Sequence, residues 1–189
     1  MPVVADLASQ TIIGFGAAPM SHLANDTPLS SGHATKYKYC PVDITVSATN
    51  RLTCTQATGI AIKGSYLFFE DNWATVCRMD IIRPIVVSGG FSGCAFKVYR
   101  GGGAFFAAHI ARPSGASADA NVALLDDYAR QKGWQEIQHV PTSGVVGANP
   151  AATAVAIVSQ LIGNSIDTVR LALNNMGQTV NVHRVTTPF

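Results

Sequence analysis

Apolar and polar residues alternate along much of the chain, which is the pattern of half-buried β-strands. The clearest example is Val42-Asp43-Ile44-Thr45-Val46, and further β-branched or apolar runs follow between turn residues. We expect strands over the ranges 42–46, 52–55, 60–63, 66–69, 77–87, 136–140, 154–162, 168–173 and 179–185. Pro84 lacks the backbone N–H of a ladder residue, which predicts an edge or a bulge in the run 77–87.

One segment has a convincing helical period. From Ser117 to Gly133, apolar side chains recur at steps of three and four residues, at Val122, Leu125, Tyr128 and Ala129. Asp119 stands near its start, and Gly133 is expected to end it. Many short strands with one good helix predict an α+β fold, a central β-sandwich of mixed or antiparallel sheets flanked by helices and loops.

Length and composition favour a single domain over residues 1–189, which is long enough to be a catalytic domain. Hydrophobic residues make up 48% of the chain and charged residues 13%, which excludes a disordered protein. Residues 1–38 are rich in Gly, Ala, Ser and Pro and are poorly specified, with at most one short helix near Ala5 to Ile13.

Charge and hydropathy exclude several partners. The net charge is +2 and the 13 lysines and arginines are scattered, so we expect no nucleic acid. No run reaches the roughly 18–20 apolar residues of a membrane span. The N-terminus lacks the basic and apolar regions of a secretory signal, so export would use a route other than that signal.

The spacing of the four cysteines does not match a metal site, because no two of them lie two to four residues apart. We therefore expect no metal and no cofactor. Two disulfides are possible on count alone, but reduced thiols are the default without a signal peptide. The four are Cys40, Cys54, Cys77 and Cys94.

The most informative segment reads as a β-hairpin, with strands over 94–100 and 104–109 on either side of three glycines. A two-residue turn at Gly101-Gly102 would pair Arg100 with Gly103, since glycine adopts positive φ easily. Counting outward from that turn gives the pairs Val98 with Phe105, Phe96 with Ala107, and Cys94 with His109. A turn of another length would shift this register.

Directly opposed side chains share a face with Cβ atoms about 4.5–5.5 Å apart, so the Cys94 thiol and the His109 imidazole would touch. An imidazolium lowers the pKa of a neighbouring thiol and then supplies a proton to the leaving group. The backbone N–H groups of Ser92, Gly93 and Cys94 are candidates for an oxyanion site, with Cys94 first. The alternative is that both side chains are ordinary core residues.

Phe91-Ser92-Gly93-Cys94, followed by a His fifteen residues later, resembles the catalytic region of cytotoxic necrotizing factor toxins and of Burkholderia lethal factor. The resemblance covers about 25 of the 189 residues. It implies a glutamine deamidase with Cys94 as nucleophile and His109 as base. It also implies a role for Ser88, which stands where the lethal factor has a Thr, although that hydroxyl could instead satisfy the turn at Gly89-Gly90.

The implied protein is a bacterial toxin or effector that acts inside a host cell. Its partner would be a host protein with a reactive glutamine, either a Rho-type GTPase or a translation initiation helicase. The same Cys–His pair could serve a cysteine protease or a transglutaminase. A non-enzymatic β-sandwich that binds a partner is the other alternative.

Overall fold

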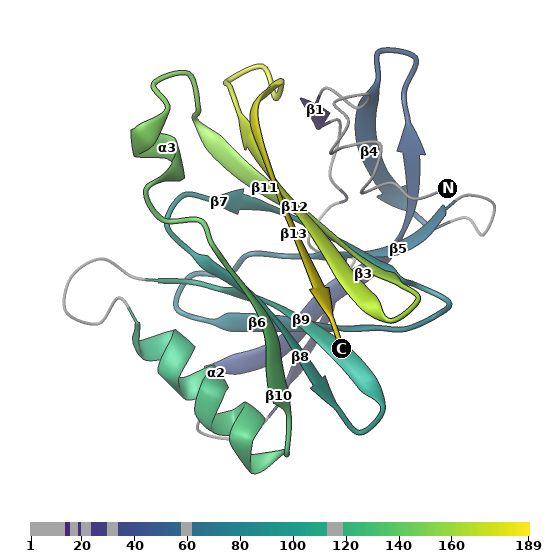
Figure 1. Ribbon diagram of the computed structural model, residues 1–189, viewed down its shortest axis with the longest axis vertical. Coiled ribbons are helices and arrows are strands. Elements are labelled where there is room, and N and C mark those ends of the chain that lie inside the picture. The colour runs from purple at the N-terminus through teal and green to yellow at the C-terminus, as the bar shows by residue number, and fades with distance from the viewer. Residues whose placement is uncertain (1–13, 16–18, 20–23, 30–33, 58–61, 113–118) are drawn as a thin grey trace.

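The computed structural model describes residues 14–15, 19, 24–29, 34–57, 62–112 and 119–189 (Figure 1). The strands are β1 (Gly14–Phe15), β2 (Asn25–Pro28), β3 (Thr35–Val46), β4 (Arg51–Gln56), β5 (Ile62–Leu67), β6 (Ala74–Met79), β7 (Ile85–Phe91), β8 (Ala95–Gly101), β9 (Ala104–Ile110), β10 (Gln135–Pro141), β11 (Ala154–Ile162), β12 (Ser165–Leu173) and β13 (Thr179–Pro188). The helices are α2 (Ala120–Gln131) and α3 (Val145–Ala148).

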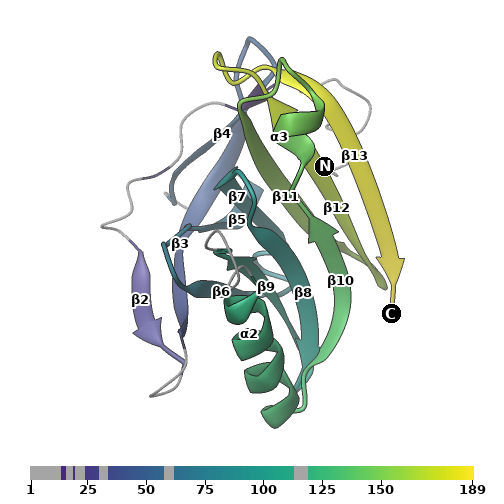
Figure 2. The ribbon, with the colours of Figure 1, turned by 90° about the vertical axis from the view of Figure 1, so that its left-hand side faces the viewer.

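All the described strands belong to one 13-stranded sheet, whose main path runs β10-β8-β9-β6-β3-β5-β7-β11-β12-β13. The sheet curls until its two ends approach each other, as Figure 2 shows for β10 and β13. The expectation of a β-rich chain with few helices is confirmed. The strands form one continuous, nearly closed sheet.

The side chain of Gln138 joins the two ends of this path. Gln138, on β10, donates from Nε2 to the Thr187 hydroxyl of β13 at 3.0 Å. Its Oε1 accepts a hydrogen bond from Thr168 on β12. Gln138 is 3% exposed, and a buried amide of this kind needs all its partners. It therefore holds the sheet nearly closed.

The predicted helix is present as α2. Leu125, Tyr128 and Ala129 are buried against the sheet, and Gly133 follows its end with φ 68°. Asp119 precedes the first turn, but its side chain makes no capping bond and instead pairs with Arg112. The short helix predicted over 5–13 lies outside the described residues. None of the described helices is long and apolar enough to cross a bilayer.

Three of the predicted strand runs are divided differently. The run 77–87 is two strands, β6 and β7, and Pro84 stands in the connection between them rather than at a bulge within a strand. The end of the run 60–63 and the start of the run 66–69 belong to one strand, β5, which continues through Gly64 and ends at Leu67, whereas residues 60–61 lie outside the described ranges. A Cβ on Gly64 would lie 2.5 Å from Ile44 and 2.9 Å from the Ile85 carbonyl oxygen, so close packing explains this glycine.

The predicted register of the β8–β9 hairpin is wrong. The two turn residues are Gly102 and Gly103, with φ of 57° and 75°, and Gly101 pairs with Ala104. Arg100 therefore faces Phe105 instead of Gly103. The other observed pairs are Val98 with Ala107 and Phe96 with His109. Since the shift is two residues, each side chain keeps the face that was expected, but Cys94 is not directly opposite His109.

Candidate active site

Cys94 follows the bend at Ser92 and Gly93 that joins β7 to β8. Its thiol is 6% exposed and lies at the wall of a pocket of about 200 Å³. Its carbonyl oxygen accepts a hydrogen bond from the buried hydroxyl of Thr142, which ties the bend to the segment after β10. The pocket is otherwise lined by Phe69, Asp71, Asn72, Ser92, Gly93, Ala111 and Arg112.

His109 lies in β9 and is 1% exposed. Its imidazole stacks on the ring of Phe91, with centroids 3.6 Å apart and planes 8° from parallel. The ring of Phe69, which also lines the Cys94 pocket, lies 5.3 Å away. The orientation of the imidazole plane is therefore fixed by aromatic packing on the side of the pocket.

Ser88, on β7, contacts His109 directly. Its Oγ lies 2.9 Å from the imidazole Nδ1 and donates to the Leu67 carbonyl oxygen at 2.7 Å. A hydroxyl has one proton and a carbonyl oxygen can only accept, so Ser88 accepts from Nδ1–H. The lone pair of the neutral ring is then on Nε2. Ser88 thus fixes the tautomer in which His109 can take a proton at Nε2, and its hydroxyl does not satisfy the Gly89-Gly90 turn.

The Nε2 atom is buried and has no hydrogen-bond partner among the described residues. Unpaired buried nitrogens are uncommon, because each one costs free energy that a hydrogen bond would recover. His109 is not itself a lining residue of the Cys94 pocket, and among the described residues no hydrogen bond joins Nε2 to the Cys94 thiol.

Cys94 and His109 are neighbours on one face without a hydrogen bond between them. Cys94 lies one position beyond the last ladder pair, Ala95 with Ile110, so it is diagonal to His109. Diagonal neighbours are typically about 7–8 Å apart at Cα, within reach of modest side-chain movement. Cys94 belongs to the same core cluster as Phe91, whose ring stacks on the imidazole, and Phe96, which pairs with His109 across β8 and β9.

Burial favours the neutral form of both groups. It raises the pKa of the Cys94 thiol above its ordinary value of 9.0, although backbone hydrogen bonds from Arg112, Ser92 and Gly93 act in the opposite direction. It lowers the pKa of His109 to about 3. The dry surroundings therefore disfavour a thiolate–imidazolium pair, because both charges lose hydration there.

The bend before Cys94 offers backbone donors to an anion. The N–H groups of Ser92 and Gly93 are close enough to the sulfur to affect its pKa. A Cβ on Gly93 would meet nothing within 4 Å, so this glycine faces open space in the pocket. Of the predicted donors, the structure places Ser92 and Gly93 at the pocket wall together with the Cys94 side chain.

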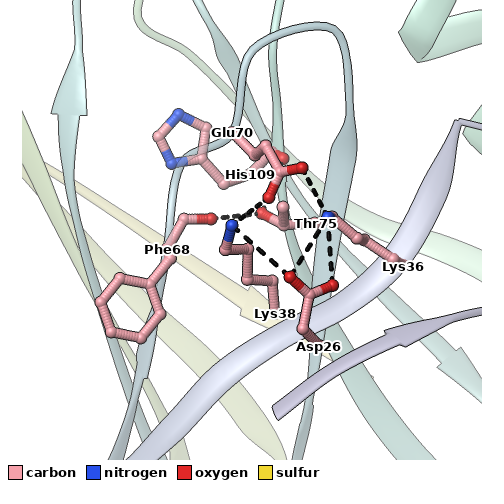
Figure 3. Close-up of polar contacts among 7 residues, drawn as sticks. All are labelled: Asp26, Lys36, Lys38, Phe68, Glu70, Thr75 and His109. Atoms are coloured by element: carbon pink, nitrogen blue, oxygen red, sulfur yellow. Dashed lines mark hydrogen bonds and ion pairs between the residues drawn. The ribbon is translucent and has the colours of Figure 1, made fainter. Parts of the chain in front are cut away.

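Sequence reasoning missed the residues that hold the backbone of His109. Thr75 pairs with His109 across β6 and β9, and its Oγ1 contacts the carbonyl oxygens of Phe68 at 2.6 Å and His109 at 3.2 Å (Figure 3). Next to Thr75, Lys36 pairs with Asp26 at 3.0 Å and with Glu70. The signal in the sequence was a threonine between two apolar residues, Ala74 and Val76.

The remaining cysteines and histidines are not brought to this site. Cys40, Cys54 and Cys77 are free, buried thiols, and burial alone raises the pKa of Cys40 to about 11. His139 and His183 are exposed, whereas His22 and His33 lie outside the described residues. Within the ranges that the structure describes, no three His, Cys, Asp or Glu side chains gather as metal ligands would.

Comparison with known proteins adds no further assignment. Neither a scan against protein-family models nor a search of curated proteins finds a match for this chain. The family resemblance therefore rests on the residues around Cys94 and His109.

Proposed function

We propose that this chain is a cysteine-dependent deamidase of protein glutamine, with Cys94 as nucleophile, His109 as base and Ser88 as the residue that positions His109. One observation carries the proposal. The imidazole is oriented by Ser88 at Nδ1 and left unpaired at Nε2, on the face that it shares with a cysteine at a pocket wall. A core histidine with no chemical task would be expected to satisfy both nitrogens.

The reaction uses the two neutral groups in sequence. As the Cys94 sulfur attacks the carbon of the glutamine carboxamide, His109 Nε2 takes the thiol proton. The oxyanion is stabilised by backbone N–H groups of the Ser92–Cys94 bend. Ammonia leaves with the proton held by His109, and a thioester remains. Water, deprotonated by His109, then releases glutamate and returns the proton to the sulfur.

The substrate is expected to be a host protein, a Rho-type GTPase or a translation initiation helicase, and the protein itself a toxin or effector delivered to the host cytosol. These assignments follow from the resemblance around Ser92-Gly93-Cys94. The two-sheet sandwich with flanking helices that the resemblance implies is likewise proposed as the finer description of the nearly closed sheet.

The test is a mass measurement on purified Rho-type GTPase and translation initiation helicase incubated with the protein. Deamidation adds one dalton per glutamine and releases ammonia. We expect both signals with the wild type and neither with Cys94→Ser or His109→Ala. His139→Ala and Cys40→Ser are the matched controls, because they remove the same residue types outside the site and should leave activity unchanged.

Other outcomes lead to other assignments. Cleavage of either protein would identify a protease, and incorporation of an added primary amine in place of water would identify a transglutaminase. If neither target gains mass and ammonia is not released from host-cell extract either, the deamidase proposal is wrong.

A non-enzymatic binding protein is the second candidate. It is favoured by the absence of a hydrogen bond between the Cys94 thiol and Nε2 and by the neutral state of both groups. In that case His109 would be a core residue stacked on Phe91. Cys94→Ser would then leave partner binding unchanged.

A further inference from the structure

A second and larger cavity lies beside α3. It has a volume of about 650 Å³ and is lined by the segment that follows β10, which includes α3, and by the strands β12 and β13. The residues that the argument uses are Ser143, Ala148 and Asn149 on one wall and Arg170 and Asn181 on the other. No acidic side chain lines this cavity.

Arg170 brings a positive charge to the cavity without a carboxylate to balance it. The side chain is half-buried, and Nη1 donates to the carbonyl oxygen of Pro141 at 2.6 Å. No ion pair of Arg170 exists in the part of the chain that the structure describes. By contrast, the buried lysines Lys36 and Lys97 each contact two carboxylates. Burial lowers the pKa of Arg170, the effect of removing a charge from water without compensation.

Amide and hydroxyl groups complete a lining that suits an anion. The Oδ1 of Asn149 already accepts the N–H of Ala151 at 3.0 Å, so its NH₂ group is the end left to donate. Asn181 and Ser143 add exposed donors. A guanidinium with neighbouring N–H and O–H donors is the usual protein partner of a carboxylate.

The cavity is joined to Cys94 by consecutive residues. Pro141 accepts the hydrogen bond of Arg170, Thr142 donates to the Cys94 carbonyl oxygen, and Ser143 lines the cavity. Three residues of extended chain span about 10 Å, so Ser143 at the cavity wall lies within about that distance of the Cys94 backbone. A substrate segment that occupies both places would have to cover a separation of about this order.

We propose that this cavity binds a carboxylate side chain of the protein substrate, with Arg170 as its cationic partner. Its assignment to the substrate rests on the proposed deamidase function. An aspartate or glutamate a few residues from the target glutamine is the expected ligand, and the cavity then selects acidic sequences among the glutamines of the host.

The first experiment measures binding without turnover. The probes are the capped peptide Ala-Ala-Glu-Ala-Ala and its counterpart with glutamine, titrated into ¹⁵N-labelled Cys94→Ser protein and followed by amide chemical shifts. We expect the glutamate peptide to shift the amides of residues 143–149 and 170–172. It should bind roughly tenfold more tightly than the glutamine peptide, as the loss of one charge-assisted contact predicts. Equal binding of the two peptides overturns the proposal.

Variants then assign the effect to the cavity. Arg170→Gln should abolish the preference for glutamate, whereas Arg78→Gln, which removes the same charge from the exposed face of β6, should retain it. Ala148→Phe fills the cavity from the exposed face of α3 and leaves Arg170 in place, so it tests the site even if Arg170→Gln does not fold. Retained preference in Ala148→Phe would also overturn the proposal.

Turnover provides the link to the substrate. Once a host protein has been shown to be deamidated, acidic residues near its target glutamine can be replaced by neutral ones. We expect these substrate variants to have a higher KM and an unchanged kcat with the wild-type enzyme. With the Arg170→Gln enzyme, the same substrate variants should show no change. The two proposals fail separately. Peptide binding without any mass gain on host proteins rejects the deamidase alone, and mass gain without glutamate preference rejects the carboxylate site alone.

Discussion

The hydroxyl of Ser88 lies 2.9 Å from Nδ1 of His109, and its own proton is directed to the Leu67 carbonyl oxygen. This short chain of two hydrogen bonds determines which imidazole nitrogen is free. It links β5, β7 and β9, so the orientation of the imidazole depends on three separate strands. Under the proposed function, the serine would orient the histidine as a carboxylate does in Ser-His-Asp hydrolases, without adding a charge to a dry site.

Replacing Ser88 should lower catalysis through His109. Ser88→Ala leaves Nδ1–H and the Leu67 carbonyl without a partner, which costs roughly 1–3 kcal/mol of stability. We expect kcat to fall about tenfold to a hundredfold, since the other tautomer becomes accessible and places its proton on Nε2. Ser88→Thr keeps the hydroxyl and should restore kcat. An equal loss in both variants would indicate a packing role only.

The stability of the protein should fall with acid because of His109. Its pKa is lowered to about 3 in the folded chain, against 6.5 unfolded, so between these values only the unfolded chain binds the proton. The contribution is complete above about pH 6.5 and is lost at about 1.4 kcal/mol per pH unit as the pH falls toward 3. Urea unfolding between pH 7 and 4.5 should show this slope, and His109→Phe should remove it.

The control for that slope is His139→Gln, since His139 is exposed and should leave the pH dependence intact. A wild-type slope identical to that of His109→Phe would mean that the imidazole is charged, or accessible to water, in the folded protein.

Cys94 should behave as a protonated thiol in the free protein. Because burial raises its pKa, its reaction with iodoacetamide should have a midpoint above pH 9.0. Cys77 is 0% exposed and should remain unmodified until the chain unfolds. Peptide mass mapping after timed alkylation separates the two. A midpoint below neutrality, lost in His109→Ala, would instead reveal a preformed ion pair.

Gly93 offers a test of the pocket that spares the fold. An added methyl group meets nothing within 4 Å, so Gly93→Ala should change the free energy of unfolding by less than about 0.5 kcal/mol. The same methyl group occupies the space that a carboxamide must enter, and activity should fall at least tenfold if the substrate binds there. Normal activity in this variant would place the reaction outside the pocket.

The sequence predicted the strands of the hairpin and the single long helix, because both depend on local periodicity. It misplaced the turn, because three consecutive glycines carry no information on which of them adopt positive φ. Packing decides that point. A Cβ on Gly101 would lie 2.2 Å from the indole of Trp134, so only a glycine allows Trp134 to pack against this position. Gly101 therefore belongs to the strand, and Gly102 and Gly103 form the turn.

Parts of the candidate site depend on contacts between distant segments and could not be predicted. The stacking of His109 on Phe91 joins β9 to β7, and the hydrogen bond from Thr142 to Cys94 joins the end of β10 to the start of β8. Hairpin geometry also says nothing about how dry the face of a strand pair is. The complete burial of His109, which favours a neutral imidazole, therefore could not be predicted either.

The closure of the sheet has a mechanical consequence. Main-chain ladders join each strand to its neighbours along the path from β10 to β13, but the two end strands of that path are bridged by the side chain of Gln138. The two end strands, β10 and β13, can therefore move apart without breaking any strand pair. Arg170 and Asn181 lie on β12 and β13, and Ser143 to Pro150 follow β10 in the chain. A change in the distance between the two ends of the sheet therefore changes the width of the large cavity. Binding of the proposed carboxylate ligand would therefore depend on how firmly the buried Gln138 joins the two ends of the sheet.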